Sequence, residues 1–258
     1  MKLTRLISLV DLQARTALQA EASRLYLSYL WWVLEPLLFV AVFYVVFEFL
    51  LARGKEDFVF FLMCGKVPYL WISKSITISG NSLLNNRGLI GSIDIPKIVF
   101  PYISLQEVLY KQWVVFMVLF LMAFYYGSYP TLEWLWLIPI VVTNYIMLVA
   151  LSLIGALLVT YAQDFRIIIN MGLMFLMFAS GIFWDINDIQ SEYWRNIILT
   201  WNPLAYLIDC YRAILMYNTS YDIYHMAAVA GVFLTLTLFL HLVYRGMNSR
   251  LTLQVLQS

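Results

Sequence analysis

The sequence predicts an all-α integral membrane protein with six transmembrane helices. Of its 258 residues, 63% are hydrophobic and 12% are charged, whereas roughly 25% of residues are charged in a typical soluble domain. Six stretches are long and apolar enough to cross a bilayer as a helix, which takes roughly 20 residues. These observations exclude a water-soluble globule and predict a single membrane domain over residues 1–258.

An amphipathic helix is expected before the first span, within residues 1–28. Apolar side chains recur there at the helical period, among charged residues that interrupt the apolar core a signal peptide would need. The apolar face is formed by Leu3, Leu6, Ile7, Val10, Ala14, Ala17 and Leu18. We therefore expect a helix lying along the membrane surface, and an ordinary solvated helix is the alternative.

The spans are expected at residues 31–51, 58–78, 103–126, 134–161, 167–184 and 226–244. Lys66, Pro68 and Lys74 interrupt the second span. Because a charge beside lipid costs about 3 kcal/mol on insertion scales, these lysines are expected to face protein or water. In the third span, Glu107 and Lys111 lie four residues apart on one helical face and are expected to pair.

Residues 188–217, between the fifth and sixth spans, are predicted to form re-entrant helices. The segment is apolar but is broken by Asn202, Pro203, Asp209 and Arg212. Broken helices persist at membrane depth only where protein or a cavity satisfies their backbone groups. If this segment does not cross, the number of spans is even and both termini lie on the same side.

The distribution of Lys and Arg predicts that this side is cytoplasmic. Loops on the terminal side are rich in Lys and Arg, whereas those on the other side are mainly acidic. The loop at 81–97 then faces the cytosol, where it presents Leu84, Leu89 and Ile90 beside polar residues. Such a segment is typical of a docking surface, and a helix lying on the membrane is the alternative.

Few residues suggest catalysis. Asp185 and Asp188 form an Asp-x-x-Asp pair that would suit magnesium on a diphosphate, although a solvated acidic loop is the alternative. His225 and His241 each lack a ligand four residues away, as a helical zinc site would need. We therefore predict no metal site.

Other classes are excluded by charge and by motif. The 16 basic and 15 acidic residues nearly cancel, so no basic surface for nucleic acid is expected. Gly65-Lys66 lacks the upstream glycine and the following hydroxyl residue of a phosphate-binding loop. If ATP drives this protein, a separate polypeptide hydrolyses it.

Polar and aromatic residues gather at the start of the first span. Trp32 and Glu35 lie near its beginning, with Tyr29 before it and Tyr44 within it. Glu35 would be costly beside lipid and should face a bundle interior, a partner subunit or water. Aromatic rings also stack on sugars, so a carbohydrate pathway is one interpretation and an interfacial aromatic belt is the other.

Five segments resemble motifs of the membrane subunits of ABC-2 type exporters, and within them of capsular polysaccharide and O-antigen permeases. They are Leu27–Pro36, Phe61–Tyr69, Asn81–Pro101, Asp164-Phe165-Arg166 and Trp201-Asn202-Pro203-Leu204, in the family's order. The first resembles Leu-Gly-x-Leu-Trp-x-x-Leu-(Glu/Asn)-Pro, with Ser28 in place of the usual glycine. The fourth rearranges the family pattern.

The resemblance implies how the subunit would assemble. Two copies would form a channel in the bacterial cytoplasmic (inner) membrane, and two ATP-binding subunits would dock below and hold ATP and magnesium. This chain would bind no cofactor directly. Residues 1–28 would be the interface helix and 81–97 the coupling loop, with contacts to the ATPase expected from Asn85, Arg87, Leu89 and Ile90.

The resemblance also implies a route for a lipid-linked glycan. The expected lining comprises Tyr29, Trp32, Glu35, Tyr44, Phe178 and Trp184. Residues 188–217 would form a gate on the outer side. Arg24 would attract a phosphate near the entrance, and a contact with a lipid head group is the alternative.

Three functional hypotheses follow. The first is the transmembrane subunit of an ATP-driven exporter of capsular polysaccharide, O-antigen or a related lipid-linked glycan. The second is an ABC-2 permease for another cargo, such as teichoic acid, a lipid or a drug. The third is a membrane glycosyl- or prenyl-transferase that uses Asp185 and Asp188. The glycan, its lipid anchor and any periplasmic export proteins are left open.

Overall fold

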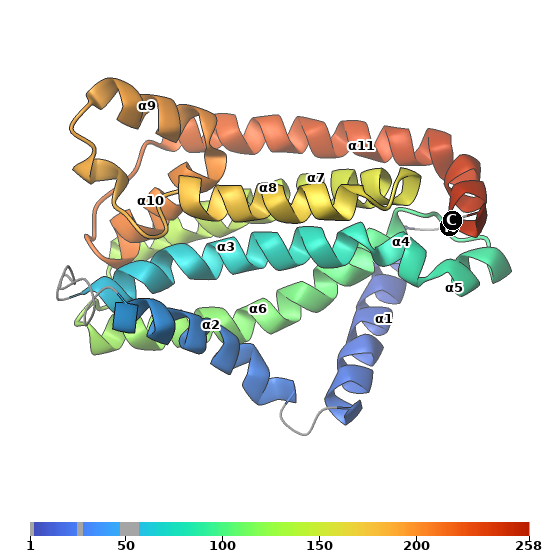
Figure 1. Cartoon of the computed structure of the whole chain (residues 1–258), viewed down its shortest axis with the longest axis horizontal. Helices are drawn as coiled ribbons and strands as arrows, with labels where there is room; N and C mark the ends of the chain where they lie inside the picture. Colours follow the sequence, from blue (N-terminus) through green and yellow to red (C-terminus); the bar gives the residue numbers. More distant parts are fainter. Residues whose placement is uncertain (1–2, 25–27, 47–56, 258) are drawn as a thin grey trace.

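The computed structural model describes residues 3–24, 28–46 and 57–257, and every secondary-structure element in these ranges is helical (Figure 1). The all-α prediction is confirmed. The main helices are α1 (Leu3–Arg24), α2 (Ser28–Tyr44), α3 (Phe58–Gly80), α6 (Val99–Tyr125), α7 (Leu137–Tyr161), α8 (Phe165–Ala179) and α11 (Ile223–Gln257). The shorter elements are α4 (Ser82–Asn85), α5 (Arg87–Ser92), η2 (Leu132–Trp136), η3 (Ile186–Asp188), α9 (Glu192–Trp201) and α10 (Pro203–Leu215).

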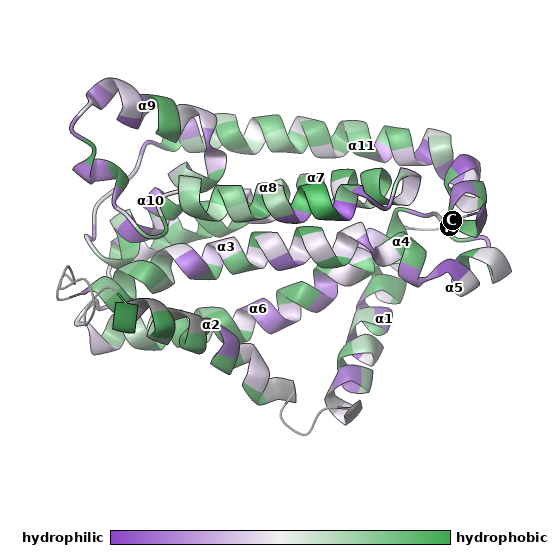
Figure 2. Ribbon diagram, viewed as in Figure 1, coloured by the Kyte–Doolittle hydropathy of each residue, from purple (hydrophilic) through white to green (hydrophobic). Residues whose placement is uncertain are grey.

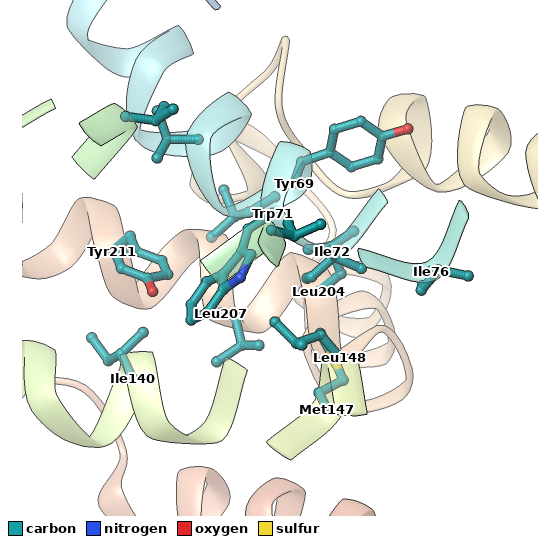
Figure 3. Packing of buried hydrophobic residues seen from close by; sticks show 14 of the residues in the cluster. Tyr69, Trp71, Ile72, Ile76, Ile140, Met147, Leu148, Leu204, Leu207 and Tyr211 are labelled. Carbon is teal, nitrogen blue, oxygen red and sulfur yellow. The ribbon is translucent and has the colours of Figure 1, made fainter. Parts of the chain in front are cut away.

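Helix α3 is the centre of the bundle. It packs against α6 and α7 most extensively, and also against α2, α8 and α10. Trp71 of α3 is almost fully buried and meets the ring of Phe116 edge-on at 5.7 Å between centroids. Figure 3 shows Trp71 among side chains of α7 and α10, including Ile140, Leu207 and Tyr211. Because α3 faces protein on most sides, it can carry charged residues that a lipid-facing helix would not tolerate.

Among the residues that the structure describes, three helical segments are long and apolar enough to cross a membrane. They are Val99–Tyr125, Leu132–Tyr161, which joins η2 to α7, and Ile223–Gln257. Helix α11 packs against α7, and much of its length is hydrophobic (Figure 2). Its exposed apolar side chains include Val232, Leu238 and Phe239. An exposed apolar surface of this kind suits lipid rather than water.

The predicted sixth and fifth spans differ in length from the observed helices. Helix α11 continues to Gln257 instead of ending at 244, since the polar residues that follow lower the hydropathy without breaking a helix. Helix α8 ends at Ala179 instead of near 184, because Gly181 adopts a left-handed conformation with φ of 72°.

Helices α2, α3 and α8 complete the bundle. In Figure 1 successive helices of the set α2, α3, α6, α7, α8 and α11 run in opposite directions between the two ends of the bundle. Helix α8 is apolar but has only 15 residues, and α3 contains two lysines. The six-span count depends on these three helices.

The two ends of the bundle carry different elements. Helices α4 and α5 lie at one end together with the C-terminus, whereas η3, α9 and α10 lie at the opposite end (Figure 1). Helix α1 packs on the outside of α6 and also touches α2. The segment predicted as an interface helix is therefore a helix attached to the bundle near the end that bears α4 and α5.

Candidate functional site

An ion-pair network joins α1 to α6. Lys111 of α6 contacts Glu107 at 2.8 Å, as the spacing of the two residues predicts, and also contacts Glu21 of α1 at 2.5 Å. The Lys111 ammonium lies 5.6 Å from the centroid of the Trp32 ring. Trp32, a predicted pathway residue, is therefore placed where α2 and α6 meet beside this network.

A second polar contact links α1 to α6 at Tyr110, the residue before Lys111. The Tyr110 hydroxyl donates a hydrogen bond to Asp11, and Arg15 pairs with the same carboxylate at 3.1 Å. The Tyr110 hydrogen bond, with a smaller contribution from Arg15, lowers the pKa of Asp11 below its ordinary value. The Asp11 carboxylate thus stays ionised at neutral pH and holds α1 against the bundle.

Helix α3 presents two lysines to its neighbours. Lys74 forms an ion pair with Glu35 of α2 at 2.5 Å, and both side chains are partly exposed. Lys66 is buried, with its ammonium 3.6 Å from the sulfur of Met177 in α8 and 4.9 Å from the centroid of the Tyr69 ring. Lys66 thus contacts protein, and the partly exposed Lys74 and Glu35 contact each other, which agrees with one of the alternatives that the sequence left open.

A buried arginine joins α10 to α3 and to the turn after α8. Arg212 is 1% exposed and donates to the carbonyls of Gly181 at 2.6 Å, Ile182 at 3.0 Å and Phe61 at 3.3 Å. The carbonyls of Gly181 and Ile182 follow the end of α8, so Arg212 supplies donors that the helix no longer provides. The sequence contains no signal for this contact beyond a charged residue in an apolar segment.

The break between α9 and α10 is stabilised by Asn202. Its side chain accepts a hydrogen bond from the backbone of Ala205, which caps α10, and donates to Ser180 at 3.0 Å and to the carbonyl of Ala179. Pro203 occupies the first turn of α10, where its missing N–H costs nothing. The predicted break is therefore confirmed, and Asn202 attaches it to the end of α8.

The segment between α3 and α6 exposes some of the predicted coupling residues and buries another. Asn85 and Arg87 are exposed and Leu89 is partly buried, but Ile90 is only 3% exposed. Arg87 also donates to the carbonyl of Leu256, near the end of α11. The structure thus buries Ile90 within this chain, and the coupling role of these residues stays a prediction.

Ile93 is an exposed apolar residue in this segment that the sequence prediction missed. It follows α5 directly and is 48% exposed. Its apolar neighbours Leu89 and Ile90 are more buried. The exposure of Ile93 differs from that of Leu89 and Ile90 because α5 packs against α11. The local sequence does not reveal this packing.

Two predicted pathway residues, Phe178 and Trp184, contact each other at the end of α8. The Trp184 indole donates to the carbonyl of Phe178 at 2.9 Å, and the rings of Phe178 and Phe183 lie 5.3 Å apart. Phe178 and Tyr44 are exposed on this chain. Tyr44 lies on a different helix from this pair, and the side chains of Tyr29 and Arg24 fall outside the described part of the structure. The pathway roles stay predictions.

The acidic pair after α8 has structural contacts. Asp185 accepts from the backbone of Asn187 at 2.9 Å and caps η3. The Asn187 side chain also donates to Asp209 of α10 at 3.0 Å. Within the residues that the structure describes, no group of three or more His, Cys, Asp and Glu side chains is placed to hold a metal ion.

The chain belongs to the ABC-2 type transporter family, whose family model matches residues 13–216. Together with its membrane-length helices, this membership makes it a multi-pass membrane protein.

Several named permeases are similar to it. It is 29% identical to the O-antigen export system permease protein RfbA of Klebsiella pneumoniae, over 85% of this chain and 86% of that protein. It is 26% identical to the protein of the same name in Myxococcus xanthus, over 88% of this chain and 86% of the relative. It is 24% identical to the polysialic acid transport protein KpsM of Escherichia coli, over 74% of each chain.

Proposed function

We propose that this chain is the transmembrane subunit of an ATP-driven exporter that moves a capsular polysaccharide, O-antigen or related lipid-linked glycan across the bacterial cytoplasmic membrane. The observation that carries the proposal is its similarity, over most of its length, to permeases named for O-antigen export and polysialic acid transport. The subunit itself would perform no catalysis.

The proposed topology has six spans, formed by α2, α3, α6, α7, α8 and α11, with both termini in the cytoplasm. The alternating course of these helices supports it (Figure 1). The end that bears α4 and α5 would then face the cytosol. Helices α9 and α10 would enter the outer leaflet and return, and their polar break is satisfied by protein as such a segment requires.

The proposed assembly is a homodimer of this chain with two ATP-binding subunits. Helices α4 and α5 would dock into those subunits, and their exposed side chains at the cytosolic end support this role. ATP and magnesium would be held by the ATPase alone. Helix α1, attached to α6 by the Lys111 network, would lie on the membrane surface beside the same partner.

A deletion strain tests the proposed function. Surface polysaccharide and cytoplasmic glycan are measured in parallel, with the wild-type gene restored as the control. Export predicts that glycan disappears from the surface and accumulates inside. Absence from both places would favour a transferase, and an unchanged surface would favour another cargo.

A second strain separates transport from the transferase hypothesis. Replacing Asp185 and Asp188 by alanine removes the only catalytic pair that the sequence suggests. Unaltered synthesis and export, normalised to permease level, would exclude the transferase. Loss of glycan synthesis would contradict the proposed function.

A further inference from the structure

A cavity of about 370 Å³ lies among α3, α4, α7 and α8, at the end of the bundle that bears α4 and α5. Its volume falls in the range of small-molecule binding sites, about 300–1,000 Å³. The polar part of its wall is formed by Thr77, Asn81, Asn85, Arg166 and Asn170. The remaining wall is apolar.

Among the described residues that line this cavity, Arg166 alone is charged. Its Nε atom is buried without a hydrogen-bond partner, and its guanidinium forms no ion pair with any residue in the described part of the chain. Asp164, two residues earlier, is exposed and does not line the cavity. Arg166 is partly buried, and a partly desolvated cation without a counterion is unfavourable, so an anionic ligand would be stabilised here.

The side-chain amides beside Arg166 indicate which other polar group the ligand would carry. Asn81 donates to the carbonyl of Thr77 at 2.9 Å, which leaves its side-chain oxygen buried without a donor. Asn170 accepts from the Thr77 hydroxyl at 3.5 Å, and its NH₂ group has no hydrogen bond among the described residues. A ligand with anionic oxygens and a neighbouring hydroxyl would satisfy Arg166, Asn170 and Asn81 together.

The surroundings suit a ligand that also carries a hydrocarbon chain. Ile76, Val159 and Ile169 form apolar parts of the wall. Ile167 and Ile168, on the adjoining turn of α8, are exposed. The polar groups lie near helix ends, whereas the apolar surface continues along α8 toward the middle of the bundle, as expected for a head group and its chain.

We propose that this cavity binds a phosphate in a lipid head group that also carries hydroxyls, with Arg166 as its principal ligand. Two sources share this chemistry: a polyprenyl diphosphate sugar and a polyol phospholipid such as phosphatidylglycerol. The further statement that the polyprenyl diphosphate sugar is the transported substrate rests on the proposed function. Binding of a phosphate and a hydroxyl by the cavity does not depend on that function.

The test measures binding to the full chain in phosphatidylcholine nanodiscs. Phosphatidylglycerol and a short polyprenyl diphosphate sugar are titrated separately, and bound lipid is counted by native mass spectrometry. Arg166→Gln is expected to weaken binding of one or both probes about tenfold, since it removes a charge-assisted contact. Arg166→Lys retains the charge and should restore most of the affinity, while Arg250→Gln, at an exposed position on α11, should leave it unchanged.

Each outcome has a defined meaning. Weakening with both probes supports a general site for such head groups, and weakening with only one identifies the source. Asn170→Asp, at an exposed position, places a negative charge in the cavity and should weaken binding independently if Arg166→Gln folds poorly. Wild-type affinity of the folded variants for both probes would overturn the proposal. An unchanged surface in the deletion test would contradict the proposed function but would not alter this binding measurement.

Discussion

Arg212 of α10 lies over the ring of Phe61 of α3, with its guanidinium carbon 3.4 Å from the ring centroid. The same guanidinium donates to the Phe61 carbonyl and to two carbonyls in the turn that ends α8. One side chain therefore joins three segments that are distant in sequence. In an apolar environment such a planar, multiply bonded cation is far more favourable than an unpaired one.

Replacing Arg212 by methionine should destabilise the protein by about 3 kcal/mol. The change keeps an apolar stem but leaves the carbonyls of Gly181 and Ile182 without this donor, and each unsatisfied group costs roughly 1–3 kcal/mol. Arg212→Lys should lose less stability, since it keeps one charged donor group, although not the planar set of donors of a guanidinium. Unfolding of the purified variants in detergent measures both. A methionine variant as stable as the wild type would contradict the proposed clamp.

Gly65 makes space for that guanidinium, and a methyl group there should be harmful. A Cβ atom at Gly65 would lie 2.9 Å from Nη2 of Arg212 and 3.3 Å from the backbone of Ile182. Gly65→Ala should therefore cost about 1–3 kcal/mol by overpacking. At Gly172 in α8, a Cβ atom meets nothing within 4 Å, so Gly172→Ala should be neutral or stabilise by roughly 0.5–1 kcal/mol. Equal unfolding midpoints for the two alanine variants would refute this explanation.

The elements that local sequence could predict are those set by local rules. The apolar runs of α6, α7 and α11, the pairing of Glu107 with Lys111, and the break at Asn202-Pro203 each depend on residues within a few turns. Hydropathy could not predict how far α11 continues, because its polar last turns still form helix.

The contacts that sequence could not predict depend on packing between distant segments. Arg212 is recognisable as a buried charge, but its partners come together only when α8 and α10 pack on α3. The opposite exposures of Ile90 and Ile93 likewise follow from α5 packing against α11. Composition and spacing do not contain that information.

Ile93 and Ile90 provide a matched test of ATPase docking. Ile93→Asp should reduce capture of the ATP-binding subunit without lowering the amount of permease in the membrane, since it changes an exposed apolar residue. Ile90→Asp should lower the permease level itself, because it buries a charge inside the chain. Pull-downs and quantitative immunoblots separate the two effects. Normal capture by the Ile93 variant would remove this residue from the coupling surface.

The Lys74–Glu35 pair should hold α2 on α3. Glu35→Lys and Lys74→Glu each place like charges together and should destabilise the protein, whereas the double exchange should restore most of the loss. Because both side chains are partly exposed, the coupling energy is expected to be about 1 kcal/mol or less. Unfolding of the four proteins measures it. Purely additive effects would show that the ion pair contributes no stability.

Trp184 allows a pathway role to be separated from a structural one. Its indole N–H donates to the Phe178 carbonyl, a hydrogen bond of roughly 1 kcal/mol. Trp184→Phe removes this bond but keeps an aromatic face, so it should lower stability slightly and preserve most export. Trp184→Ala removes the face on which a sugar would stack and should reduce export severalfold. Surface glycan is measured at equal permease levels, and full export by the alanine variant would exclude Trp184 from the lining.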